Sequence, residues 1–108
     1  MIDIYIKKSG DDIKVVTVSG HGGGLAGKDI VCSAVSAITQ TALSGLLYYG
    51  NSNIFWKIQK GTLFIKVKEG TDKENRMIFN IILSTMILGL KRIAKEYPDK
   101  ITIRVEEN

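Results

Sequence analysis

Hydrophobic and polar residues alternate in five short stretches of the chain, and this period of two predicts half-buried β-strands. The first stretch alternates isoleucine with polar residues over positions 2–7. The other predicted strands cover residues 13–19, 54–59, 62–68 and 101–105. Turn-forming residues at 9–12 and the pair Lys60-Gly61 predict that the strands on either side of each turn form hairpins.

A longer stretch from about Ile30 to Tyr49 has small and apolar residues at intervals of three and four, which predicts a helix with one buried face. Asp29 is placed to be its N-cap, since a carboxylate there can accept a hydrogen bond from an unpaired N–H of the first turn. The sequence Gly-Asn-Ser-Asn at 50–53 predicts the end of this helix.

A second helix is predicted from Thr71 to about Tyr97, ahead of Pro98. Thr71 and Glu74 have the spacing of a capping box, in which each side chain satisfies the other residue's backbone N–H. Residues 78–90 are apolar on more than one side, which is more than a helix covering one face of a sheet needs. This excess predicts burial on a second side, either deep in the core or at a self-association interface.

The resulting order, ββαββαβ, predicts an α+β fold: a two-layer sandwich whose mostly antiparallel or mixed sheet carries both helices on one face. With 108 residues and no repeats or linkers, the chain is expected to form one domain over 1–108. The last residues, Glu106 to Asn108, are expected to be a frayed tail.

The composition points to a protein of the cytoplasm. One cysteine cannot form an internal disulfide. The longest apolar run, residues 78–90, is shorter than the ~20 residues that span a membrane, and the N-terminus is patterned as a strand rather than as a signal peptide. We therefore expect a cytoplasmic location and no membrane partner.

The net charge of +4 is compatible with a nucleic-acid or ribosome-associated partner. Most of the lysines, however, alternate with apolar residues along the predicted strands, which places them on a solvated face. Direct nucleic-acid binding is therefore not expected. The alternative function is a non-enzymatic ribosome- or RNA-associated small basic domain, which predicts RNA binding that weakens steeply with salt.

The stretch from Ser19 to Ser36 contains the chain's single histidine, His21, and its single cysteine, Cys32, on either side of a glycine-rich loop. The predicted helix start places Cys32 in the first turn, where the positive end of the helix dipole favours a thiolate. A histidine folded back over it could take the thiol proton, and first-turn N–H groups could stabilise an oxyanion. The pattern indicates a cysteine nucleophile, although a lone cysteine is more often a small buried apolar residue.

Three further polar residues could complete this site. Asp29 could either cap the helix or orient His21, and the capping role is favoured because a carboxylate near Cys32 disfavours the thiolate. Ser36 lies one helical turn beyond Cys32 and Gln40 one turn further, so both could line a pocket floor. For Gln40, ordinary helix surface is a nearly equal alternative.

Two other kinds of site match the loop only in part. Residues 22–29 have the glycine and lysine spacing of a Walker A loop, but Asp29 replaces the Ser or Thr that holds magnesium, and its charge would repel phosphate. Zinc normally takes three or four ligands from protein, and one histidine and one cysteine are too few. We therefore expect no metal and no cofactor.

The same residues resemble the ribosomal-processing cysteine protease family of bacteria. The family pattern is Gly-His, a flexible loop, Gly-Lys-Asp-Ile-Val-Cys, a small residue and Ala-Val-Ser, and residues 20–21 and 27–36 match it. The order of strands and helices is also similar along the whole chain. The resemblance implies a small homodimeric endopeptidase that removes a short N-terminal extension from a large-subunit ribosomal protein, cutting after an aromatic-rich sequence.

The resemblance also implies roles for individual residues. His21 and Cys32 would be the catalytic dyad, supported by Asp29 and Ser36, and no cofactor would be needed. The flexible loop between them supplies further candidates for substrate binding, since glycine lets a loop move over a pocket. These loop candidates are Gly20, Gly22 and Gly27.

Overall fold

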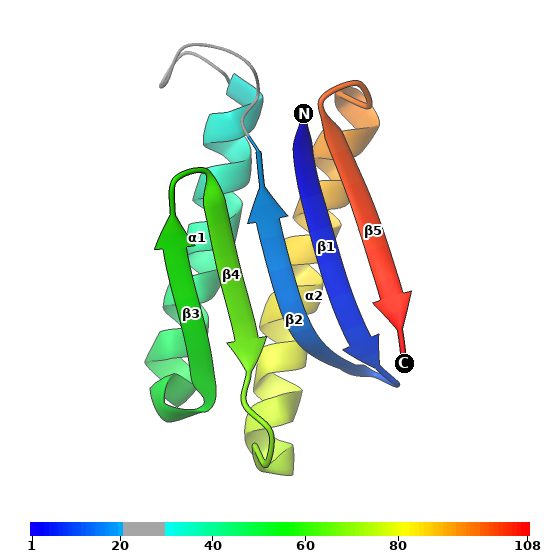
Figure 1. Cartoon of the computed structure of the whole chain (residues 1–108). Helices are drawn as coiled ribbons and strands as arrows, with labels where there is room; N and C mark the ends of the chain where they lie inside the picture. Colours follow the sequence, from blue (N-terminus) through cyan, green and yellow to red (C-terminus); the bar gives the residue numbers. More distant parts are fainter. Residues whose placement is uncertain (21–29) are drawn as a thin grey trace.

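The computed structural model describes residues 1–20 and 30–108, and its elements follow the predicted order (Figure 1). The strands are β1 (Ile2–Ser9), β2 (Asp12–Ser19), β3 (Ile54–Gln59), β4 (Thr62–Val67) and β5 (Ile101–Glu107). The helices are α1 (Ile30–Gly50) and α2 (Lys73–Glu96), with a short 3₁₀ turn at Asn51–Asn53. The predicted α+β fold, with both helices on one face of the sheet, is confirmed (Figure 1).

The sheet has five strands in the order β3-β4-β2-β1-β5. Neighbouring strands are antiparallel except β1 and β5, which run parallel. This pairing is possible because α2 carries the chain back to the end of the sheet where β4 began, so β5 runs in the same direction as β4 and β1 (Figure 1). The outer strands, β3 and β5, each have one edge with no partner among the described strands.

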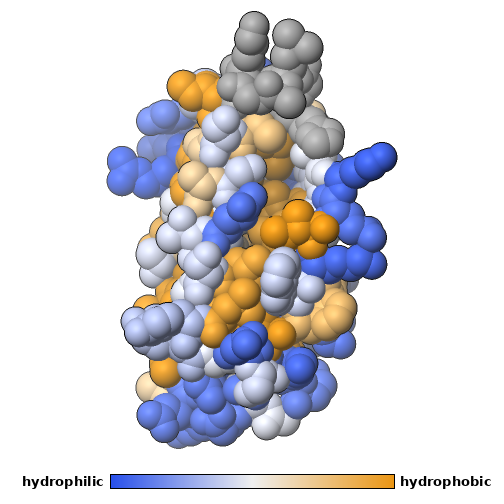
Figure 2. Space-filling model, turned by 90° about the vertical axis from the view of Figure 1, so that its left-hand side faces the viewer, coloured by the Kyte–Doolittle hydropathy of each residue, from blue (hydrophilic) through white to orange (hydrophobic). Residues whose placement is uncertain are grey.

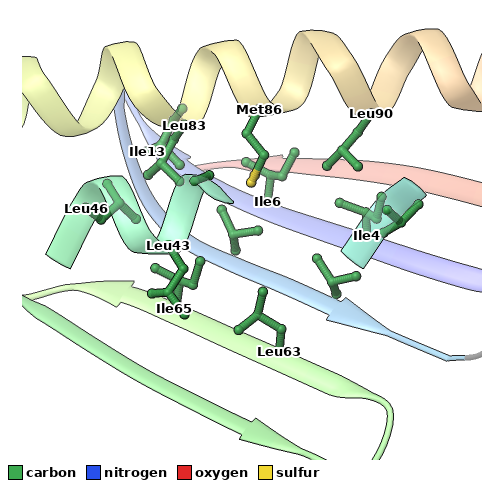
Figure 3. Close-up of a cluster of buried hydrophobic side chains, with 14 of the residues drawn as sticks. Ile4, Ile6, Ile13, Leu43, Leu46, Leu63, Ile65, Leu83, Met86 and Leu90 are labelled. Atoms are coloured by element: carbon green, nitrogen blue, oxygen red, sulfur yellow. The ribbon is translucent and has the colours of Figure 1, made fainter. Parts of the chain in front are cut away.

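The core lies between the sheet and the two helices, which run antiparallel to each other (Figure 1). Alternate residues of each strand point inward, which explains why the buried positions repeat with a period of two. Figure 3 shows part of this cluster, in which the labelled residues are Ile4, Ile6, Ile13, Leu43, Leu46, Leu63, Ile65, Leu83, Met86 and Leu90. Burying an apolar side chain of this size contributes about 1.5–3 kcal/mol.

Helix α2 is apolar beyond what the core uses. Leu83 and Leu90 are buried in the core, whereas Ile81 and Leu88 are 66% and 64% exposed on the outer side of the helix. Both helical segments are long and apolar enough to cross a membrane, judged by length and composition alone. The core helices of soluble proteins also meet this criterion. Here each helix packs one side on the sheet, and the excess apolar surface predicted for α2 lies on the outside.

The two helices approach each other closely at two glycines. A Cβ on Gly45 would lie 3.6 Å from Cδ1 of Ile82, and a Cβ on Gly89 would lie 3.4 Å from Cδ1 of Ile38. Each glycine therefore faces an isoleucine of the other helix, at a distance where a Cβ would make ordinary van der Waals contact.

The start of α2 differs from the prediction by one residue, because the N-cap is Asp72 and not Thr71. The Asp72 carboxylate accepts hydrogen bonds from the backbone N–H of Asn75 at 3.2 Å and from its side-chain amide at 2.7 Å. The Thr71 hydroxyl instead donates to the carbonyl of Lys68 at 2.6 Å. The predicted capping box with Glu74 is therefore wrong: Asp72 takes the capping role itself.

The C-terminal residues do not form a frayed tail, since β5 continues to Glu107 alongside β1. The Tyr5 hydroxyl donates a hydrogen bond to the carboxylate of Glu106, and this bond raises the pKa of Tyr5. The N–H of Asn108 donates to the carbonyl of Lys8 at 3.0 Å. Strand β1 is eight residues long, so it offers backbone partners along the whole of β5.

Polar contacts join α2 to the turn between β1 and β2. The side-chain oxygen of Asn80 accepts from the N–H of Ile13 at 2.9 Å, and its amide nitrogen donates to the carboxylate of Asp12 at 2.9 Å. Nε of Arg76 lies 3.4 Å from the second carboxylate oxygen of Asp12. These contacts fix the position of α2 along the sheet.

Candidate active site

Cys32 lies in the first turn of α1, as the sequence predicts, because the described helix begins at Ile30. Its side chain is half-buried. The first N–H groups of a helix have no carbonyl partner within it, and the helix dipole adds partial positive charge at this end. The other predicted residues of the dyad and loop, His21, Gly22, Gly27 and Asp29, lie outside the described residues.

Cys32, Ser36 and Gln40 share one side of α1 at intervals of one turn, and all three line a cavity of about 230 Å³. The structure therefore brings together the three residues that the helical spacing places on one face. Gln40 contributes to the cavity wall, although its side chain is otherwise exposed on the helix surface. The inner wall is formed by residues of the core, namely Ile2, Val18, Val35, Thr39 and Leu63.

The opposite wall of the cavity comes from the hairpin of β3 and β4, a part of the site that the sequence does not indicate. It is lined by Ile58, Gln59, Gly61 and Thr62. The hairpin reaches the site because β4 pairs with β2, whose last residue, Ser19, lies opposite Thr62. The turn residues predict the hairpin itself. The alternation of hydrophobic and polar residues, however, does not show which strands become neighbours in the sheet.

Gly20 holds the chain at the rim of the cavity where β2 ends. Its φ of +97° is rarely adopted by other residues, and a Cβ there would lie 2.2 Å from the carbonyl oxygen of Met1. Its N–H donates to the carbonyl of Gly61 at 3.0 Å, which joins the end of β2 to the hairpin turn. Of the glycines predicted for the site, Gly20 is the one within the described residues, and it does line the cavity.

No charged side chain lines this cavity among the described residues. The polar groups of the lining are hydroxyls and amides, from Ser36, Thr39, Gln40, Gln59 and Thr62. Such groups can hydrogen-bond the neutral groups of a peptide backbone. Within residues 1–20 and 30–108, no cluster of three or more histidine, cysteine, aspartate or glutamate side chains could hold a metal ion.

Comparison with protein families gives a match over nearly the whole chain. The model of the cysteine protease Prp family matches residues 1–102. The matched region contains both helices, the cavity and Cys32. A comparison with curated proteins finds no match.

Solved structures share this fold along nearly their whole length. SMU.848 from Streptococcus mutans has a TM-score of 0.84 at 22% identity, covering 100% of this chain and 96% of that chain. The essential ribosomal processing protease Prp from S. aureus, in complex with a covalently linked product peptide, has a TM-score of 0.83 at 24% identity, covering 98% and 100%. The same protease in complex with a substrate peptide gives 0.82 at 23% identity, covering 98% and 100%. At these identities the likeness establishes the fold.

Proposed function

We propose that Cys32 is the nucleophile of this chain, which belongs to the cysteine protease Prp family and is therefore a cysteine endopeptidase. A cysteine protease needs a thiol, and Cys32 is the only cysteine in the sequence. It lies in the first turn of α1 and lines a cavity with a neutral, polar wall. This coincidence of a required thiol with a helix start and a cavity is the observation that carries the proposal.

His21, the only histidine, is the proposed base. It takes the proton of the Cys32 thiol, and the thiolate attacks the carbonyl carbon of the scissile peptide bond. N–H groups in the first turn of α1 stabilise the oxyanion of the tetrahedral intermediate. The C–N bond then breaks, the imidazolium gives its proton to the leaving amine, and the acyl group remains on sulfur as a thioester. Water, deprotonated by His21, hydrolyses the thioester and restores the thiol.

The residues between His21 and the helix are proposed to support this chemistry. Asp29 immediately precedes the first helical residue and is proposed as its N-cap, with the orientation of His21 as its alternative role. Gly22 and Gly27 belong to the intervening loop, which is proposed to close over the substrate.

The proposed substrate is a bacterial large-subunit ribosomal protein, from which a short N-terminal extension is removed by one cut. The S. aureus relative, a ribosomal processing protease solved with a substrate peptide, supports this choice. The Ser36 hydroxyl and the Gln40 amide line the cavity and can hydrogen-bond the backbone of such a peptide. The proposed location is the cytoplasm, and no metal or cofactor is part of the mechanism.

The alternative of a non-enzymatic RNA-associated domain is not supported, because the family consists of proteases. Direct nucleic-acid binding forms no part of the proposed function. The described walls of the cavity carry no cationic side chain, and binding to phosphates depends on lysine and arginine. RNA binding that weakens steeply with salt would contradict this part of the proposal.

The test is to incubate the purified protein with the extended ribosomal protein of its own organism and to identify the products by mass spectrometry. Wild type is expected to make one cut, at the end of the extension. Cys32→Ala and His21→Ala are expected to make none while keeping the wild-type circular dichroism spectrum. Ser33→Ala is the matched control, because Ser33 is adjacent to Cys32 but exposed. Cleavage by Cys32→Ala at the wild-type rate would contradict the proposal.

We further propose that the protein is a homodimer joined through the outer side of the helix pair. Ile81 and Leu88 are exposed there, and a hollow of about 580 Å³ between α1 and α2 is lined mostly by apolar and small residues. Apolar patches of this kind mark interaction surfaces. Sedimentation velocity is expected to give a dimer for wild type and for the control Val105→Glu on β5, and a monomer for Ile81→Glu. A monomeric wild type would contradict this assembly.

A further inference from the structure

We propose that the outer edge of β3 is the docking strand for the substrate peptide, which adds to the sheet as a further strand and places an apolar side chain against Trp56. This inference rests on the proposed function, because it states how the same site recognises its substrate. It is carried by the free backbone groups of this edge, by the uncovered apolar side chains beside them, and by the continuity of both with the cavity of Cys32.

The backbone groups of Trp56 and Ile58 face outward. In an antiparallel pair, residues that bond to the partner strand alternate with residues whose N–H and C=O point away from it. The N–H of Lys68 donates to the carbonyl of Asn53 at 2.9 Å, which fixes the phase of this alternation between β3 and β4. Residues 55, 57 and 59 therefore bond to β4, and the backbone of residues 56 and 58 faces the outer edge, where no described strand pairs with it.

The side chains of the same two residues are apolar and uncovered. They project on the helix side of the sheet, because their partners on β4 are the buried residues Ile65 and Leu63. Only the start of β3 is covered: Ile54 is 5% exposed, whereas Trp56 is 43% and Ile58 is 50% exposed. Figure 2 views the molecule from the left-hand side of Figure 1, where β3 lies, and shows hydrophobic surface gathered along the middle of this view.

The two edges of the sheet differ in how they are protected. Natural proteins usually guard an exposed edge with charged side chains. On β5, the exposed side chains include Arg104, Glu106 and Glu107. β3 has a single charge, Lys57, and its pairing with Phe64 places it on the open face of the sheet, away from the helices. The β3 edge is therefore suited to pair with another extended chain.

The neighbouring cavity indicates which extended chain pairs with the β3 edge. Ile58 and the next residue, Gln59, line the same cavity as Cys32. A segment paired with Trp56 and Ile58 would therefore run alongside a strand whose last residues line the cavity. A peptide substrate of Cys32 is the partner that fits both the edge and the cavity.

The first part of the test compares cleavage with binding for a synthetic peptide that spans the end of the proposed extension. Cleavage by wild type gives kcat/KM, and fluorescence anisotropy with Cys32→Ala gives the affinity. Trp56→Ala is expected to weaken binding and to lower kcat/KM at least about tenfold, mostly through KM. Val105→Ala, which removes an exposed apolar side chain from the opposite edge, should change neither. Unchanged melting temperatures show that both variants fold.

Peptides that each carry one N-methylated amide test the strand pairing itself. Each methyl group removes one N–H, so binding should be lost at alternate residues of the docked segment and nearly unchanged at the residues between them. Suppose that wild type cleaves the peptide while N-methylation shows no alternating loss of binding and Trp56→Ala changes neither binding nor kcat/KM. That result overturns the docking strand and leaves the proposed function standing. If Trp56→Ala converts a dimer into a monomer, the β3 edge pairs with a second copy of the chain, and the docking-strand proposal is also overturned. If wild type neither binds nor cleaves the peptide, the proposed function fails and this inference fails with it.

Discussion

Helices α1 and α2 cover the same face of one sheet, yet their side chains serve different purposes. Helix α2 has charged residues near both ends and fills the core with Phe79, Leu83, Met86 and Leu90. Helix α1 carries no charged residue and directs the polar groups of its first turns toward a cavity. Both helices therefore pack buried residues into the core, and α1 in addition carries the site.

The two helices also differ in the contacts that attach them to the sheet. Helix α2 is fixed at its start by the Asp72 cap and further along by Asn80, which binds the turn between β1 and β2. Helix α1 is held along its whole length by buried apolar residues, from Val31 and Val35 near its start to Leu43 and Leu46 further on, while Cys32 is only half-buried. Substitutions that face the cavity from α1 should therefore change catalysis without unfolding the protein, and core substitutions in α2 should do the reverse.

The largest expected effect is on catalysis and comes from α1. Cys32→Ala is expected to lower kcat/KM by at least about 10⁴-fold, because the chain has no other thiol. Its melting temperature should stay within about 2 °C of wild type, since the truncated side chain is not part of the fully buried core. Peptide cleavage and scanning calorimetry on the same sample check both. A variant that loses activity by unfolding would erase the contrast between the helices.

The opposite pattern is expected in α2. Leu83 is 1% exposed, so Leu83→Ala should lower the free energy of unfolding by about 2–5 kcal/mol through lost burial and a residual cavity. The fraction that remains folded should cleave at the wild-type rate. Urea titration measures the stability, with Ser84→Ala as the exposed neighbouring control. Equal stability of the two variants would show that α2 does not hold the fold.

A smaller effect should distinguish two serines within α1. Ser36→Ala is expected to lower kcat/KM about tenfold, because one hydrogen bond to the substrate is lost, and to leave the melting temperature unchanged. Ser44→Ala is the control: Ser44 is exposed and its hydroxyl donates to the carbonyl of Gln40 at 3.0 Å, outside the cavity lining. Steady-state kinetics on the two variants test this, and equal losses of kcat/KM would show that lining the cavity gives Ser36 no role of its own.

The smallest effect concerns the cap of α2 and depends on pH. Hydrogen bonds from the side chain and backbone of Asn75 hold the pKa of Asp72 below its ordinary value. A lowered pKa means that the carboxylate stabilises the fold at neutral pH and that this contribution is lost as the pH falls through the lowered value. Asp72→Ala should therefore melt a few degrees lower than wild type at pH 7, with unchanged kcat/KM. Calorimetry in acid should show that the difference in melting temperature between wild type and Asp72→Ala disappears. A difference that grows in acid would contradict the predicted direction of the pH dependence.

Most of the fold could be predicted from the sequence, because burial on one face imposes the period of a strand or a helix on each element. The exceptions lie at element ends. Glu106 and Glu107 show no alternation, and their order comes from pairing with β1, which no local pattern reports. Thr71 and Asp72 are both good capping residues, and the choice between them depends on Asn75, whose amide reaches the Asp72 carboxylate.

The site could be predicted only as far as one helix carries it. Cys32, Ser36 and Gln40 meet at the cavity because helical spacing places them on one face. The wall formed by Ile58 could not be foreseen, since it depends on which strands become neighbours. The pattern of β3 gives no sign that Trp56 is left uncovered, because that depends on where the helices lie over the sheet.

The central claim is that Cys32 is the nucleophile, and chemical labelling tests it without any substitution. Because the chain has one cysteine, iodoacetamide alkylates one defined thiol. Intact mass spectrometry and peptide cleavage are measured on the same samples at increasing extents of labelling. Residual activity is expected to equal the unlabelled fraction and to reach zero at full labelling. Fully alkylated protein that still cleaves the peptide at the original rate would contradict the claim.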